Sequence, residues 1–203
     1  DMLLIYKNMP LGAVISSHTS IVPVLDRMGI GLGVGEATVE EVCINKGVDV
    51  DFLLSILNTF LNEGYFPEKS FQRASKEDVL SYLKSTYEYY LTSQIPVIEA
   101  HMSHLERGES TTLHMLKRMV GDLKSAISSA MENDSKMDFD ASDEYCQTAI
   151  SLIDDVKSLI IKHISGPYNK NMCYALLFFL SSFHKDLSHH LRIRYRVLIP
   201  MMK

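Results

Sequence analysis

The sequence predicts an all-α protein in which a small helical domain precedes an up-down bundle of four long helices. Apolar residues recur at three- and four-residue spacing along most of the 203 residues, which is the period of an amphipathic helix. Helix start and stop signals flank these stretches. No segment shows the convincing alternation of a half-buried strand. We therefore place the small helical domain in residues 1–68 and the bundle in residues 75–203.

Composition and net charge argue against several classes of protein. The chain is 46% hydrophobic with a formal net charge of -5, so neither disorder nor a basic surface for direct nucleic-acid contact is expected. The longest apolar run, residues 173–180, is shorter than the roughly 20 residues of a membrane span, so no membrane partner is expected. Cys43, Cys146 and Cys173 are far apart, which argues against a disulfide framework and favours a cytoplasmic location.

The first helical stretch covers residues 11–28, where Pro23 is expected to bend or split the helix and Gly29 to end it. Thr38 and Glu41 form a capping-box pattern at the start of the next helix. Either Asp49 or Asp51 is expected to cap the helix that follows. These short helices make up the small domain.

The rest of the sequence predicts longer elements. Residues 64–74, with a proline and alternating charge, are expected to be a linker, and the polar residues 133–142 a loop. The four bundle helices are expected over residues 75–98 with a kink at Pro96, about 111–131, about 143–163, and 171–200.

The stretch MGIGLGVGE at residues 28–36 raises the question of a phosphate-binding loop. A dinucleotide loop needs G-x-G-x-x-G after a strand, and the register here fails because Val34 stands at the third glycine position and a helix precedes the stretch. A Walker loop ends in Gly-Lys-Ser/Thr, whereas Gly35 is followed by Glu36. We expect a structural turn whose glycines supply positive φ and close backbone approach.

The sequence around this turn resembles a known domain. Residues 24–30 (VLDRMGI), 38–43 (TVEEVC) and 47–49 (GVD) are similar to the small N-terminal domain of the bacterial repair-of-iron-centres family. That family carries a Cys-Cys pair just after the Gly-Ile step, where this sequence has residues 32–34 (LGV). The resemblance implies that the thiol chemistry of this turn is absent here.

The resemblance continues into the predicted bundle. Residues 89–91 (YYL) and 94–96 (QIP) resemble the family's first bundle helix, and residues 186–191 (DLSHHL) and 197–200 (VLIP) resemble its last. This likeness implies a hemerythrin-like four-helix bundle. Such bundles hold two irons through inward histidines and carboxylates, with His and Glu four residues apart.

The metal ligands that the resemblance implies are incomplete. The spacing of the last helix predicts an inward stripe of Leu176, Leu180, Phe183, Leu187, His190 and Arg194. His190 takes a ligand position in it, but the residue four positions later is Arg194, a cation that repels a metal. The family's histidine on the first helix falls at Glu88, residues 126–138 contain no histidine, and the nearest polar candidate on the third helix is Asp154 or Asp155. We therefore expect no metal and no cofactor, with iron as the alternative.

An inward arginine needs a carboxylate partner in a dry bundle. We expect Glu88 or Asp155 to pair with Arg194, with His190 in the same polar cluster, and these four are the candidate ligand-binding residues. The alternative is a helical phase shifted by one position, which lets Arg194 extend along the surface. A separate metal site at His101, His104 and His114 is disfavoured, because exposed helix-end histidines are commoner.

These observations predict a non-catalytic sensory or regulatory module rather than an enzyme. In bacteria, domains of this kind can precede a helix-turn-helix DNA-binding domain, so an output domain of a LuxR-type transcriptional regulator is expected outside this chain. Two alternatives stay open. One is an iron-binding protein in iron handling or in oxygen or nitric-oxide sensing, using Glu88, His190 and Asp155; the other is a dimerisation scaffold that forms a homodimer.

Overall fold

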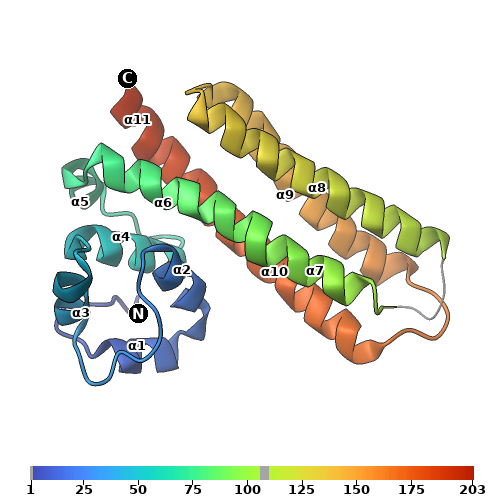
Figure 1. Ribbon diagram of the computed structural model, residues 1–203, viewed down its shortest axis with the longest axis horizontal. Coiled ribbons are helices and arrows are strands. Elements are labelled where there is room, and N and C mark those ends of the chain that lie inside the picture. The colour runs from blue at the N-terminus through green and yellow to red at the C-terminus, as the bar shows by residue number, and fades with distance from the viewer. Residues whose placement is uncertain (1, 106–109) are drawn as a thin grey trace. The chain divides into compact units, whose positions relative to one another are not determined.

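The computed structural model describes residues 2–105 and 110–203, and within these ranges the chain forms helices and no strand. The predicted all-α class is confirmed (Figure 1). None of the helices in the described part of the chain combines the length and apolarity needed to cross a membrane. The chain divides into two compact units, residues 1–85 with 196–203 (unit 1) and residues 86–195 (unit 2).

The first helical stretch of unit 1 breaks earlier than predicted. Helix α1 spans Leu11–Ser17, a 3₁₀ turn spans Thr19–Ile21, and α2 spans Val22–Arg27. The break falls at His18 rather than at Pro23, which lies in the first turn of α2. Proline is tolerated there because an N-terminal helical residue has no intrahelical acceptor for its N–H.

The helix caps of unit 1 agree with the sequence. Helix α3 (Val39–Lys46) has a capping box, in which the Thr38 hydroxyl accepts from the Glu41 amide at 3.2 Å and the Glu41 carboxylate accepts from the Thr38 amide at 2.8 Å. Two residues were candidate caps for α4 (Val50–Leu61). Asp49 is the cap, because its Oδ1 accepts from the Phe52 amide at 2.8 Å.

The glycine turn between α2 and α3 follows only part of the prediction. Gly29, Gly33 and Gly35 have positive φ, at 81°, 88° and 57°, which favours glycine over other residues. The predicted close backbone approach is wrong, because a Cβ atom at any of these positions would meet no heavy atom within 4 Å. The conformation of the turn therefore explains these three glycines without a ligand.

The stretch predicted as a linker contains helix α5 (Glu68–Arg73), and α6 (Lys76–Tyr89) follows it closely. The interior of unit 1 includes buried apolar residues of α4, among them Phe52 and Leu53. Phe52 packs edge-on against Tyr82 of α6, with ring centroids 6.2 Å apart. Segments on both sides of the predicted linker therefore share the core of unit 1.

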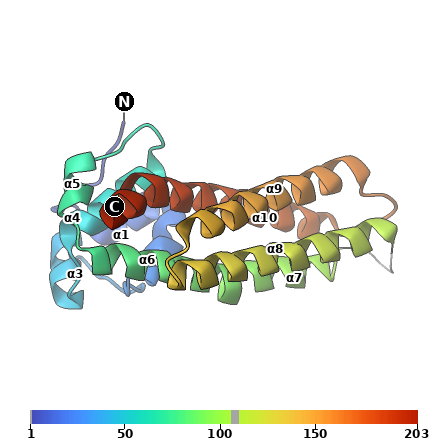
Figure 2. The same cartoon turned by 90° about the horizontal axis from the view of Figure 1, so that it is seen from above.

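Unit 2 contains four helices that run side by side in alternating directions (Figures 1 and 2). Each packs against its neighbours in the order α7, α8, α9, α10 and back to α7, around one apolar core. Their bounds are Ile95–Met102 for α7, Thr111–Ser135 for α8, Phe139–His163 for α9 and Lys170–Ile193 for α10. The loop predicted at residues 133–142 shrinks to residues 136–138.

Two π-helical segments interrupt the long helices, η2 over Tyr90–Gln94 and η3 over Arg194–Leu198. Each is followed directly by an Ile-Pro pair that opens α7 or the terminal α11 (Ile199–Met202). A proline inside a helix lacks the amide donor and clashes with the carbonyl four residues earlier. A wider π turn is one way to accommodate such a clash, so the kink predicted at Pro96 takes this form.

Candidate functional site

The polar residues of the predicted stripe on α10 lie inside unit 2. All six stripe residues are buried, namely Leu176, Leu180, Phe183, Leu187, His190 and Arg194. Arg194 is 0% exposed, so the alternative in which it extends along the surface is wrong. The inward phase of the helix, predicted from spacing alone, is confirmed.

Arg194 bonds to the turn between α8 and α9. Its Nε donates to Asp143 Oδ1 at 2.8 Å, and its Nη1 donates to Asp134 Oδ2. Its Nη2 donates to the backbone carbonyl of Phe139 at 3.3 Å. Asp134 lies in the last turn of α8 and Asp143 in the second turn of α9, so one side chain holds three helices together.

Tyr87 joins this cluster from α6. Arg194 Nη1 donates to Tyr87 Oη at 3.3 Å, and that hydroxyl donates to Asp134 Oδ2 at 2.9 Å. Burial raises the pKa of the Tyr87 phenol above its ordinary range, so it stays protonated as a donor. Cys146 Sγ lies 3.6 Å from the same hydroxyl, and burial raises the pKa of that thiol to about 11.

His190 packs beside this cluster, as predicted. Its ring centroid lies 4.6 Å from that of Tyr87 at an interplanar angle of 63° and 6.2 Å from that of Tyr90. Tyr90 in turn donates from its hydroxyl to Asp186 Oδ1 at 2.6 Å. The polar interior of unit 2 therefore extends over about two helical turns, from Asp186 in α10 to Arg194 directly after it.

The predicted partners of Arg194 are wrong. Glu88 and Asp155 are both exposed, because the inward positions beside them are taken by Tyr87 and Val156. Adjacent residues on a helix point about 100° apart. The carboxylates that bind Arg194 are those of Asp134 and Asp143 instead.

A signal for the true partners was present in the sequence. The buried residues of α8 step through Leu123, Ile127 and Ala130, and the next position of that series is Asp134. On α9 the buried series begins with Asp143 and continues through Cys146. Asp134 was missed because the second bundle helix was predicted to end at about residue 131. Asp143 was missed because the third helix was predicted to begin at this residue, whereas α9 begins four residues earlier, at Phe139.

The charges in this cluster do not fit a di-iron centre. Two carboxylates face one guanidinium, and arginine keeps its charge at all relevant pH values. The oxygens that would be needed as metal ligands already accept from Arg194, and a metal would have to sit against a fixed cation. Within residues 2–105 and 110–203, no group of three or more His, Cys, Asp or Glu is arranged to hold a metal ion.

His101 and His104, of the second set of histidines, lie at the end of α7 or just after it and bond to its backbone. His101 Nδ1 donates to the Val97 carbonyl at 2.8 Å and His104 Nδ1 to the Ala100 carbonyl at 2.9 Å. His114 is exposed on α8. Residues 106–109 of the turn between these helices lie outside the described part of the chain.

Comparison with known proteins gives no family. No protein-family model matches this sequence. No curated protein is significantly similar to it. The likeness to the repair-of-iron-centres family therefore rests on the short motifs quoted above.

Proposed function

We propose that this chain is a non-catalytic sensory or regulatory module, built on a hemerythrin-like bundle in which an arginine ion-pair network stands where that fold would hold iron. The observation that carries the proposal is the complete burial of Arg194 four residues after His190 on α10. This is the position at which the resemblance calls for a metal-binding carboxylate, and the opposite charge is found there.

The chemistry of the network supports a structural role over catalysis. Arg194, Tyr87 and Cys146 are at most 1% exposed, so a substrate would have to enter a packed core to touch them. A reactive cysteine needs a lowered pKa and access to solvent. Burial has the opposite effect on Cys146, raising the pKa of its thiol.

Replacing a whole buried ion pair by apolar residues often costs little net stability, so we infer that this network serves to specify one arrangement of the helices. Arg194 opens η3, and the chain leaves unit 2 after Tyr195. Two residues later, Arg196 binds Glu68 and stacks on the Phe66 ring of unit 1, with its guanidinium carbon 3.7 Å from the ring centroid. Residues 194–196 thus carry one arginine that binds within unit 2 and one that binds within unit 1.

The proposed setting is a bacterial cytoplasm, with a helix-turn-helix output domain encoded beyond Lys203. Sequencing the gene downstream of this codon tests that part. A continuous reading frame with a recognition-helix pattern supports the regulator, and a stop codon directly after Lys203 contradicts it. A homodimer is a separate proposal, which light scattering on the purified chain tests.

A further inference from the structure

The outer face of helices α9 and α10 in unit 2 exposes large apolar side chains. Ile161 of α9 is 66% exposed, and Tyr174 and Phe178 of α10 are 63% and 68% exposed. A single exposed apolar side chain is ordinary on a protein surface, whereas a contiguous group of them marks an interaction site. The position of these three residues relative to one another therefore decides whether they form such a site.

The register of α9 and α10 brings apolar residues of the two helices to the same level. Asp154 Oδ1 of α9 lies 3.4 Å from His184 Nε2 of α10, so these two residues are level with each other. The two helices run in opposite directions (Figures 1 and 2). Ile161, two turns after Asp154, is therefore level with Leu177, two turns before His184.

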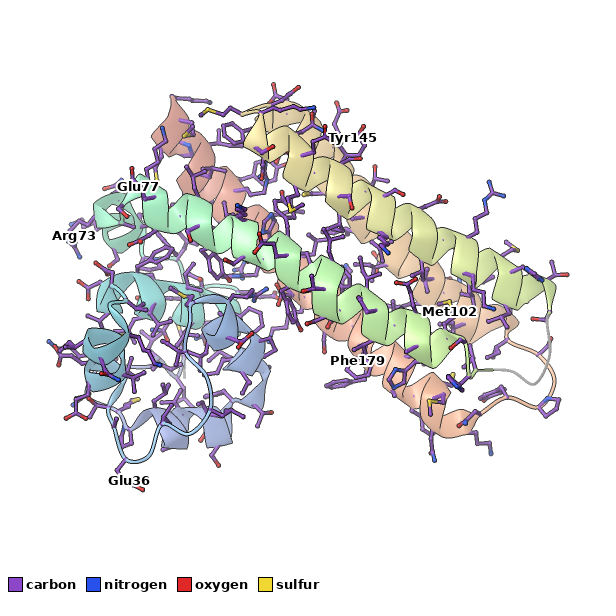
Figure 3. All side chains as sticks on the ribbon, in the orientation of Figure 1. Glu36, Arg73, Glu77, Met102, Tyr145 and Phe179 are labelled. Carbon is purple, nitrogen blue, oxygen red and sulfur yellow. The ribbon has the colours of Figure 1, made fainter. Side chains whose placement is uncertain are left out.

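Residues on the exposed side of α10 extend this pair into a larger surface. Tyr174 is three residues before Leu177 and four before Phe178, and side chains at these spacings are neighbours on a helix. Phe178 packs against Phe179, which is labelled in Figure 3, with ring centroids 5.8 Å apart, and Phe179 packs against His101 of α7 at 5.1 Å. These contacts position Phe178 before any partner arrives, which lowers the entropy cost of binding. We call the following residues the apolar patch: Ile161, Tyr174, Leu177 and Phe178.

The apolar patch lies in a basic region of a chain whose formal net charge is -5. No acidic residue occurs in the sequence between Asp155 and Asp186. Lys162 directly follows Ile161 and is exposed, and Lys170 is exposed at the start of α10. The lysines of this interval are Lys157, Lys162, Lys170 and Lys185. A partner with negative charges beside its apolar side chains is therefore complementary to this face.

We propose that the apolar patch binds an amphipathic helix of a partner protein, with Asp or Glu residues beside the apolar stripe of that helix. A third helix packs on two antiparallel helices by inserting its side chains between theirs. Recognition of this kind uses apolar anchors three or four residues apart, which is also the spacing of Tyr174 from Leu177 and Phe178. Tyrosine is enriched among the residues that dominate binding energy, so Tyr174 should contribute most.

Charge and packing disfavour two other occupants of this face. A second copy of the chain would bring the same lysines together, and like charges across an interface repel. An anionic bilayer attracts lysines, but an interfacial helix immerses its main apolar face in the lipid. That face of α10 is buried in the core of unit 2. The acidic helix therefore fits this face better than either.

Fluorescence anisotropy on the full chain tests the proposal with a labelled peptide of about 20 residues, in which Leu repeats at i, i+3, i+4 and i+7 and Glu and Ala fill the other positions. The comparison peptides have Lys in place of Glu, or the same composition in scrambled order. Tyr174→Ser alters the apolar patch and Lys162→Glu its basic border. The matched controls are Tyr145→Ser, at an exposed residue of α9 labelled in Figure 3, and Lys124→Glu, at an exposed residue of α8.

The expected result is saturable binding of the acidic peptide with a Kd on the order of 10⁻⁵ M. Tyr174→Ser should weaken this binding by roughly tenfold and Lys162→Glu by about threefold or more, and neither control variant should change it. The proposal is overturned if the acidic peptide does not bind, if the lysine or scrambled peptide binds as tightly, or if the patch variants bind as the controls do.

Two further measurements separate the other occupants. Vesicles of phosphatidylcholine and phosphatidylserine in equal amounts should not retain the chain, and light scattering should show no dimer that Tyr174→Ser abolishes. Retention by the vesicles without binding of the acidic peptide would assign the apolar patch to a lipid surface, and a dimer lost in Tyr174→Ser would assign it to a second copy. Either result overturns the proposal. The outcome is independent of the proposed function, because none of these variants changes a residue of the Arg194 network.

Discussion

Arg194 and Asp143 are joined inside unit 2 by a hydrogen bond of 2.8 Å between the guanidinium Nε and the carboxylate Oδ1. Both side chains are largely removed from water, at 0% and 12% exposure. The two buried charges stabilise each other, because either charge alone would carry its full desolvation cost. The stability of the bundle should therefore respond strongly to either residue.

Asp143→Ala removes one of the two carboxylates that hold Arg194. We expect a loss of about 3 kcal/mol in the free energy of unfolding, because a buried cation is left partly uncompensated. Urea unfolding of the full chain measures this loss. Asp140→Ala, at an exposed residue in the first turn of the same helix, is the control and should change stability by less than about 0.5 kcal/mol. Equal effects of the two changes would contradict a buried ion pair.

Arg194→Lys keeps the charge but removes the fork of donors. A lysine cannot bond at once to both aspartates and to the Phe139 carbonyl, so we expect a loss of about 1–3 kcal/mol. The exposed Arg118 on α8 serves as the matched control. If Arg194→Lys proves as stable as Arg118→Lys, the three-way geometry of the guanidinium contributes nothing.

The buried Cys146 thiol should make stability depend on alkaline pH. Burial raises its pKa from 9.0 to about 11, so between these values the unfolded chain has lost a proton that the folded chain keeps. Stability then falls as pH rises through this window, by about 2–3 kcal/mol for a shift of this size. Urea unfolding at both ends of the window checks the slope, which Cys146→Ala should make shallower. An unchanged slope in this variant would assign the effect to other groups.

The capping box at the start of α3 should contribute about 1 kcal/mol to the free energy of unfolding. Thr38→Ala removes the hydroxyl that accepts from the Glu41 amide and leaves an orphan donor at the helix start. Thr111→Ala, at an exposed helical position that is not a cap, provides the comparison. An equal decrease of the thermal unfolding midpoint in both variants would show that the Thr38 cap stabilises the protein no more than an exposed helical threonine does.

Local features of this protein were predictable from sequence because local chemistry decides them. The caps at Thr38 and Asp49 need only a side-chain oxygen and a nearby amide. The inward stripe of α10 follows from the helical period, which placed His190 and Arg194 correctly. Such signals involve residues within one or two turns of each other.

The partners of Arg194 were not predicted, because pairing depends on where helices end and which ends meet. Asp134 lies in a polar stretch whose composition suggests a loop, and Asp143 directly follows that stretch, yet packing of the α8–α9 pair continues both helices into it. The π-helical segments before Pro96 and Pro200 were missed for a related reason. A proline signals a break, but the surrounding bundle selects how the backbone accommodates it.

The proposed function requires that the interior of unit 2 holds an arginine network and does not bind iron. Elemental analysis with an absorption spectrum, on protein purified anaerobically and then given iron, tests it most directly. We expect no stoichiometric iron in the wild type or in His190→Ala. Stoichiometric iron in the wild type that is lost in His190→Ala would contradict the proposed function and support an iron-binding protein.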